Sequence, residues 1–103
     1  MIDQQKRMDL RARAGGKCKV CGKLLPLDGP IGVRGEAAHR IAKAKWTLKR
    51  YGEEVIDDLR NLEWTCHDHN SAVLITFNPV ERERLVDEIR GESRNSRPDR
   101  LGA

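Results

Sequence analysis

Two short pairs of metal-binding residues, far apart in the sequence, constrain this chain more than any other feature. Two residues separate Cys18 from Cys21, and Cys66 and His69 repeat that spacing beyond the long segment of residues 22–65. Zinc takes four sulfur or nitrogen ligands at tetrahedral corners, and a two-residue spacer lets one turn supply two of them. The two pairs therefore predict a closed Cys3His zinc site, which is structural because no coordination position is left open.

A metal staple of this kind suits the length and composition of the chain. The sequence has 103 residues, which predicts one domain, and only 4% of them are aromatic. So short a chain buries a modest share of its surface, and a metal compensates for a small core. Its three cysteines are an odd number, so they cannot close a disulfide framework within one chain, and reduced thiolates that hold a metal fit better.

Three other interpretations of these residues stay open. Cys18-x-x-Cys21 also matches a thioredoxin-like redox pair, but that motif needs a preceding strand and a following helix, whereas Gly15-Gly16-Lys17 precedes it and a loop rich in Pro and Gly follows. The spacing could arise by chance. His67 is the rival for the histidine ligand, and His69 is preferred because its spacing mirrors that of the first pair.

The first half of the chain predicts a helix, a strand region and a second helix. Residues 3–14 are rich in helix-forming side chains, and Gly15-Gly16 ends that helix. Residues 31–41 predict a strand or a pair of short strands. Residues 43–51 predict a short basic helix, with Gly52 in the stop position.

The second half predicts a short strand followed by two helical segments. The apolar residues between positions 59 and 64 indicate the strand, and residues 70–77 look helical. Asn78-Pro79-Val80-Glu81 combines an N-cap, a proline at the first helical position and a capping acid, so it predicts a helix start. Gly91 should end this helix, and residues 92–103 should form a flexible tail.

Charge is unevenly distributed along the chain. The net charge is +4, with basic segments at residues 1–23 and 36–50 and an acidic segment at residues 51–70. This pattern is typical of a protein that binds a polyanion and carries carboxylates near a metal, although ordinary solvated charge is the alternative. The sequence lacks an apolar stretch long enough to span a membrane, and its start lacks the apolar core of a secretory signal, so we expect a cytoplasmic protein.

The order of four motifs resembles the HNH endonuclease family. These motifs are Cys18-x-x-Cys21, Ala38-His39-Arg40-Ile41, Asn61-Leu62 and Cys66-x-x-His69-Asn70, and together they cover residues 17–75. The resemblance implies a small α+β domain of the ββα-metal (HNH or His-Me finger) type. In this fold a β-hairpin and a helix grip one divalent metal, the Cys3His zinc staples the domain, and N- and C-terminal helices flank it. We expect a single HNH domain over residues 1–91.

The resemblance also implies roles in hydrolysis of DNA phosphodiester bonds. His39 would be the general base that activates water, because a neutral imidazole accepts a proton near pH 7. Asn61 would bridge backbone groups and hold His39 in position. Asn70 would offer an oxygen to a catalytic Mg²⁺ or Mn²⁺. The residues expected to meet DNA phosphates are Arg40, Lys43, Lys45, Lys49 and Arg50. We expect low sequence specificity, nicking or double-strand cleavage, and a monomer or weak homodimer.

One position departs from the family pattern. The residue before the general base is usually Asp or His and binds the catalytic metal, but here it is Ala38, which has no ligand atom. Another carboxylate could substitute, with Glu36, Asp57 and Asp58 nearest in sequence and Glu36 and Asp58 taken as tentative ligands. The metal could instead be held weakly by Asn70, water and DNA phosphate. A zinc-stabilised nucleic-acid-binding module without catalysis is the alternative function.

Overall fold

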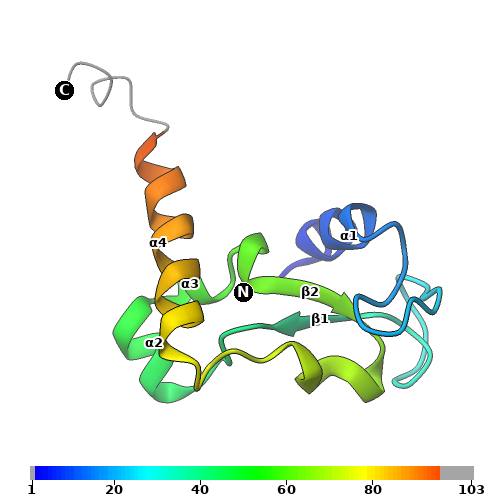
Figure 1. Cartoon of the computed structure of the whole chain (residues 1–103). Coiled ribbons are helices and arrows are strands. Elements are labelled where there is room, and N and C mark those ends of the chain that lie inside the picture. The colour runs from blue at the N-terminus through cyan, green and yellow to red at the C-terminus, as the bar shows by residue number, and fades with distance from the viewer. Residues whose placement is uncertain (1, 96–103) are drawn as a thin grey trace.

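The computed structural model, which describes residues 2–95, consists of a two-stranded sheet and several helices (Figure 1). The first part of the chain forms helix α1 (Gln4–Arg13), strand β1 (Glu36–His39), and helices α2 (Lys45–Tyr51) and α3 (Glu53–Ile56). The 3₁₀ helix η1 (Leu59–Asn61), strand β2 (Leu62–Thr65), the 3₁₀ helix η2 (His67–Val73) and helix α4 (Pro79–Asn95) follow. The architecture is therefore α+β, as predicted.

The two faces of the sheet carry different kinds of residue. Strands β1 and β2 are antiparallel, with Ala37 opposite Trp64 and His39 opposite Leu62. Since side chains alternate along a strand, these four residues share one face. Leu62 and Trp64 are fully buried in a cluster with Leu10 of α1, so this face looks toward α1, while β1 contacts η2 as well. Figure 1 shows α1 and η2 on opposite sides of the sheet.

The core consists of two hydrophobic clusters. One joins α1, the cysteine turns and β2, and its buried members are Leu10, Cys18, Leu25, Leu62, Trp64 and Cys66. The other joins α2, α3 and α4, and its buried members are Ile41, Tyr51, Val55, Ile56, Leu85, Val86 and Ile89. The chain passes between the clusters just after His39 and again at Asn61, so these two residues lie at the junction.

The predicted ends of α1 and the predicted stop of α2 are confirmed. Asp3 caps α1 by accepting a hydrogen bond from the Lys6 N–H at 2.9 Å. Gly15 and Gly16 follow the helix with φ angles of 65° and 75°, which favour glycine. Gly52 ends α2 with a φ of 89°.

The predicted strand over residues 31–41 is too long, because only Glu36–His39 pair with β2. The Pro30 carbonyl accepts hydrogen bonds from the N–H groups of Val33 and Arg34, which bends the chain into a turn before the strand begins. The residue types of this segment do not reveal this local competition for backbone groups.

The predicted helical segment over residues 70–77 is confirmed only as far as Val73, because the helical segment is the 3₁₀ helix η2 and ends there. The next residues bond to the junction instead. The Ile75 N–H donates to the Arg40 carbonyl at 2.7 Å, and the Thr76 hydroxyl accepts from the Ala42 N–H at 2.8 Å. Tertiary hydrogen bonds thus take the backbone groups that a longer helix would use.

Helix α4 begins as predicted but does not end at Gly91. The Asn78 side chain accepts a hydrogen bond from the Glu81 N–H at 3.1 Å, and the helix then continues to Asn95. A glycine inside a helix costs only about 1 kcal/mol, which the flanking residues outweigh. Of the predicted tail, residues 92–95 belong to α4, and residues 96–103 lie outside the described part of the chain.

Within residues 2–95, no helix has both the length and the apolar character needed to cross a bilayer.

Candidate metal centre and candidate active site

The four predicted zinc ligands come together at one end of the sheet. Ligand atoms of Cys18, Cys21, Cys66 and His69 all lie within 4.8 Å of one another. The Cys66 sulfur lies 3.9 Å from that of Cys18 and 4.0 Å from that of Cys21. Zinc–sulfur bonds of about 2.3 Å in a tetrahedron place two sulfurs about 3.8 Å apart, so the set fits zinc.

The first pair of ligands lies in a tight hairpin turn. Lys17 and Leu24 form a bridge, and the Cys18 N–H donates to the Lys23 carbonyl at 2.8 Å. The turn is anchored to the sheet, since the Lys19 N–H donates to the Trp64 carbonyl at 2.8 Å. This hairpin differs from the strand-to-helix context of a redox pair, and its two sulfurs face the Cys66 sulfur across the site.

The electrostatics of the cluster favour binding of a cation. Burial alone would raise the pKa of the Cys18 thiol, but backbone N–H groups of Cys21, Cys66 and Val20 outweigh it and lower that pKa to about 6. The pKa of Cys66 is raised, first by burial and further by the neighbouring sulfurs. A divalent ion offsets both burial and repulsion among thiolates, because it binds the deprotonated form.

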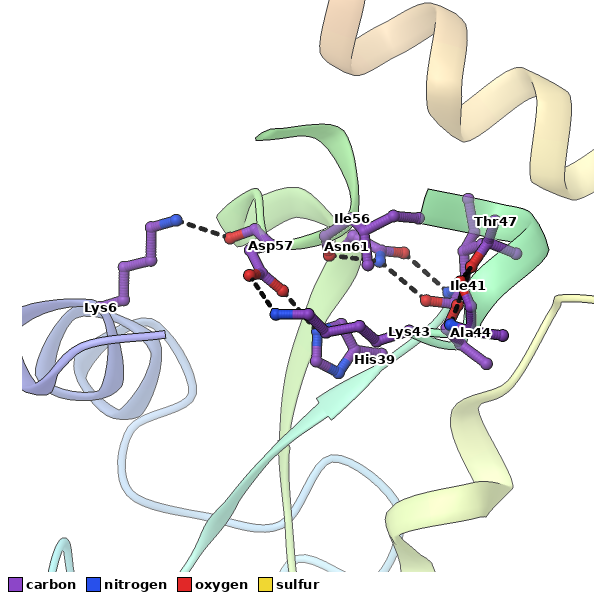
Figure 2. Close-up of polar contacts among 10 residues, drawn as sticks. Lys6, His39, Ile41, Lys43, Ala44, Thr47, Ile56, Asp57 and Asn61 are labelled. Carbon is purple, nitrogen blue, oxygen red and sulfur yellow. Dashed lines mark hydrogen bonds and ion pairs between the residues drawn. The ribbon is translucent and has the colours of Figure 1, made fainter. Parts of the chain in front are cut away.

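The His39 imidazole is held by a buried carboxylate. His39 is the last residue of β1 and its side chain is 19% exposed, whereas Asp57, which follows α3, is 1% exposed. The His39 Nε2 atom lies 2.9 Å from Asp57 Oδ1 (Figure 2). Lys43 approaches the same carboxylate, with its Nζ atom 2.8 Å from Oδ2. The Lys6 ammonium donates to the Asp57 backbone carbonyl at 2.8 Å.

Asp57 is ionised in this arrangement. Its burial would raise the pKa of the carboxyl, but hydrogen bonds from Lys43 and His39 outweigh that effect and hold the pKa well below its ordinary value. The Asp57 carboxylate in turn raises the pKa of Lys43. An ionised carboxylate can only accept hydrogen bonds, so the His39 Nε2 atom must carry the proton between them.

Asn61 bridges two segments of backbone at the junction of the two clusters. The side chain is fully buried, and its Oδ1 atom accepts from the Ile41 N–H at 2.8 Å. Its amide nitrogen donates to the carbonyls of Ile41, at 3.1 Å, and Ile56, at 2.7 Å (Figure 2). The Asn61 carbonyl also accepts from the Arg40 N–H at 2.8 Å. These bonds fix the chain directly after His39 to the segment that precedes β2.

Glu36, Asn70 and His67 form a second polar group on the η2 side of the sheet. The Asn70 amide donates to Glu36 Oε1 at 2.8 Å, and His67 Nδ1 lies 2.7 Å from Glu36 Oε2. His67 is therefore not a member of the zinc set. Glu36 and His39 lie three residues apart on β1, so they face opposite sides of the sheet. The structure thus pairs Asn70 with Glu36 and His39 with Asp57.

Asp58, the third acid considered from the sequence, binds an arginine. Asp58 Oδ1 and Oδ2 each accept a hydrogen bond of 2.9 Å from the Arg60 guanidinium, and Oδ1 accepts another from the Arg60 N–H. These contacts cap η1 and lower the pKa of Asp58 against the opposing effect of its burial. The Asp58 carboxylate therefore stabilises a local turn.

The five basic residues predicted to meet DNA differ in their surroundings. Lys43 binds Asp57, and Arg50 contacts Tyr51 and Glu83. Lys45 and Lys49 are exposed on α2, and Arg40 is half-buried. Two exposed lysines on one short helix are the clearest cations for phosphate contact.

Compared with protein-family models, curated proteins and solved structures, the chain has no match. The resemblance to HNH endonucleases therefore rests on the sequence motifs alone.

Sequence reasoning missed two side-chain partnerships. Asp57 was considered as a metal ligand rather than as the partner of His39, and His67 was considered as a zinc ligand rather than as the partner of Glu36. No local pattern links residues 18 or 31 positions apart. An acid that directly follows the buried pair Val55-Ile56 was the one available signal that Asp57 lies inside.

Proposed function

We propose that this chain is a divalent-metal-dependent endonuclease of the HNH type that hydrolyses DNA phosphodiester bonds, with His39 as the general base. The observation that carries the proposal is the half-buried His39 imidazole with its Nε2 atom fixed on an ionised, buried carboxylate. A histidine oriented by a carboxylate in this way is a common arrangement for a general base.

The hydrogen bond to Asp57 defines what His39 can do. Since Nε2 donates to Asp57, the Nδ1 atom of the neutral ring carries the lone pair. In the proposed reaction Nδ1 takes a proton from water as the water oxygen attacks phosphorus, while the bond from phosphorus to the leaving sugar oxygen breaks and that oxygen takes a proton from solvent. The ring then becomes positively charged, and Asp57 stabilises that charge. Lys43 keeps Asp57 ionised throughout, which preserves the orientation of the ring.

The residues present also offer oxygen and nitrogen ligands to a divalent cation. Glu36 contacts both Asn70 and His67, so these three side chains could supply such ligands together. Ala38 contributes no ligand atom, but Glu36 lies on the same face of β1 two residues earlier. A cation bound to Glu36 and Asn70 would neutralise a phosphate of the bound DNA on that face of the sheet, whereas His39 would activate water on the other face. Mn²⁺ suits this mixed set better than Mg²⁺ does.

The zinc cluster and the basic surface support the same proposal. The Cys3His cluster ties η2, which carries Asn70, to the turn before β1, so a structural zinc would stabilise both sides of the sheet. Lys45 and Lys49 would contact phosphates, which adds affinity without sequence selectivity.

A zinc-stabilised binding module without catalysis is the second candidate. Ala38 favours it, and so does the placement of Glu36 and His39 on opposite faces of β1. The two candidates differ in one measurable property, because both bind nucleic acid but only the first cuts it.

The test is a nicking assay on supercoiled plasmid DNA with zinc-replete protein. Parent, His39→Ala and Asp57→Asn proteins are purified identically, and zinc content and circular dichroism confirm that each is folded. We expect nicking by the parent with Mn²⁺ and none when Mn²⁺ is omitted. His39→Ala should lose about 10²- to 10⁴-fold in rate, the range for general base catalysis. Equal nicking by parent and His39→Ala, or binding without nicking in both Mn²⁺ and Mg²⁺, rejects the proposal.

A further inference from the structure

Two of the four aromatic residues are exposed, although the chain has few large side chains to bury. The sequence has two Trp, one Tyr and one Phe. Trp64 and Tyr51 lie in the two core clusters, but Trp46 is 42% exposed and Phe77 is 87% exposed. An aromatic ring buries more apolar area than most other side chains, so leaving two in solvent points to a use outside the core.

Trp46 is held by an arginine that is itself fixed. The Arg82 guanidinium lies 5.5 Å from the centre of the Trp46 ring. That guanidinium donates to the Tyr51 hydroxyl at 2.8 Å and to the Thr76 carbonyl at 2.8 Å, and it contacts Glu83 at 3.2 Å. The indole therefore rests on a rigid cation while part of its surface stays open to solvent.

Phe77 is displayed by a segment that is anchored on both sides. Thr76, directly before it, accepts hydrogen bonds from Arg82 and from the Ala42 N–H. Asn78, directly after it, donates to the Ile75 carbonyl at 2.9 Å and caps α4. The exposed ring thus belongs to an ordered turn, and the turn is tied to the same arginine that supports Trp46.

The surroundings of Trp46 carry positive charge. Lys45 precedes it, and Lys49 lies three residues later, on the same side of helix α2. Both lysines are exposed. Exposed rings beside cations match a strand of nucleic acid, in which bases stack on aromatic faces while phosphates meet the cations. A base pair inside a duplex keeps its faces stacked on its neighbours, so an open aromatic face selects unpaired bases.

We propose that Trp46 and Phe77, joined through Arg82, form a stacking site for unpaired bases of single-stranded DNA. We call these three residues the aromatic surface. This proposal rests on the proposed function only in that both take DNA as the partner. Base stacking itself requires neither His39 nor a divalent cation. It would favour DNA that is single-stranded or locally opened over closed duplex.

The experiment measures binding of a fluorescein-labelled twelve-nucleotide oligo(dT), without added Mg²⁺ or Mn²⁺, by fluorescence anisotropy. Trp46→Ala and Phe77→Ala should each weaken binding about 5- to 150-fold, the effect of removing one stacking partner. Val80→Ala is the matched control, since Val80 is 66% exposed at the start of α4 but is apolar and not aromatic, and it should bind within twofold of the parent. Quenching of the Trp46 fluorescence gives a second readout, because Trp64 is buried.

Three outcomes overturn the aromatic surface. Trp46→Ala and Phe77→Ala could bind oligo(dT) as tightly as the parent does. The parent could prefer a duplex of the same length. Light scattering could find a dimer that Phe77→Ala separates, which would assign this face to a second copy of the chain. Oligo(dT) binding that depends on both rings, without plasmid nicking, would reject the nuclease but leave the aromatic surface standing.

Discussion

Replacement of Asn61 by alanine should destabilise the protein more than any other asparagine substitution. The Asn61 side chain is fully buried and makes hydrogen bonds of 2.8, 3.1 and 2.7 Å to backbone groups of Ile41 and Ile56. Alanine leaves one N–H and two carbonyls without this partner. Each buried polar group left unpaired costs about 1–3 kcal/mol, so the expected loss for the three groups is about 3–9 kcal/mol. The free energy of unfolding of a domain is about 5–15 kcal/mol, so this is a large fraction.

Urea unfolding of zinc-saturated protein, followed by circular dichroism, measures this loss. Asn78→Ala is the matched control, because Asn78 is exposed and caps α4 through one hydrogen bond of 3.1 Å. Loss of such a cap costs about 1 kcal/mol. If Asn61→Ala lowers the free energy of unfolding no more than Asn78→Ala does, the bridge does not stabilise the junction and the reasoning fails.

Three further substitutions test the zinc site, the packing of the sheet and the buried acid. His69→Ala should abolish stoichiometric zinc binding, measured by metal analysis after dialysis, whereas His67→Ala should retain it; the reverse result would exchange their roles. Gly35→Ala should lower the melting temperature, because a Cβ atom there would lie 2.0 Å from the buried indole of β2, whereas Gly91→Ala meets no atom within 4 Å and should raise it. The pKa of Asp57 is lowered in the folded protein, so its ionised carboxylate stabilises the fold at pH values above the ordinary pKa of a carboxyl group. This stabilisation is lost as the pH falls through roughly 5 to 2. Asp57→Asn should flatten that part of the stability profile in acid unfolding, and an unchanged slope would contradict the assignment.

The zinc cluster was the most predictable feature because its information is local. Spacing within each pair already places two ligands on one turn, and two such turns need only to meet. Helix α1 was predictable for a similar reason, since Asp3 and the Gly15-Gly16 pair mark its ends within the sequence. In each case the signal lies within a few residues of the feature it predicts.

The partners of the site residues could not be predicted, because they are set by tertiary contacts. The sequence offered three acids near Ala38, and Glu36 and Asp58 were taken from it as tentative metal ligands. The fold gives each a different partner, with Glu36 beside Asn70, Asp57 beside His39 and Asp58 beside Arg60. The end of η2 was mispredicted for the same reason, since hydrogen bonds to residues 40 and 42 decide where helical structure stops.

The separate positions of Glu36 and His39 predict that substitutions at these two residues change different kinetic parameters of nicking. Glu36 shares the face of Ala38, whereas His39 lies on the other face about 10 Å farther along β1. With Glu36, Asn70 and the adjoining His67 as its few ligands, the cation should bind weakly, so nicking should need millimolar Mn²⁺. Glu36→Gln should raise the Mn²⁺ concentration for half-maximal nicking, and Asp58→Asn should not. His39→Ala should instead lower the maximal rate, because a missing base is not replaced by more cation. Recovery of the parent rate by His39→Ala at high Mn²⁺ would show that His39 positions the cation and does not accept the proton.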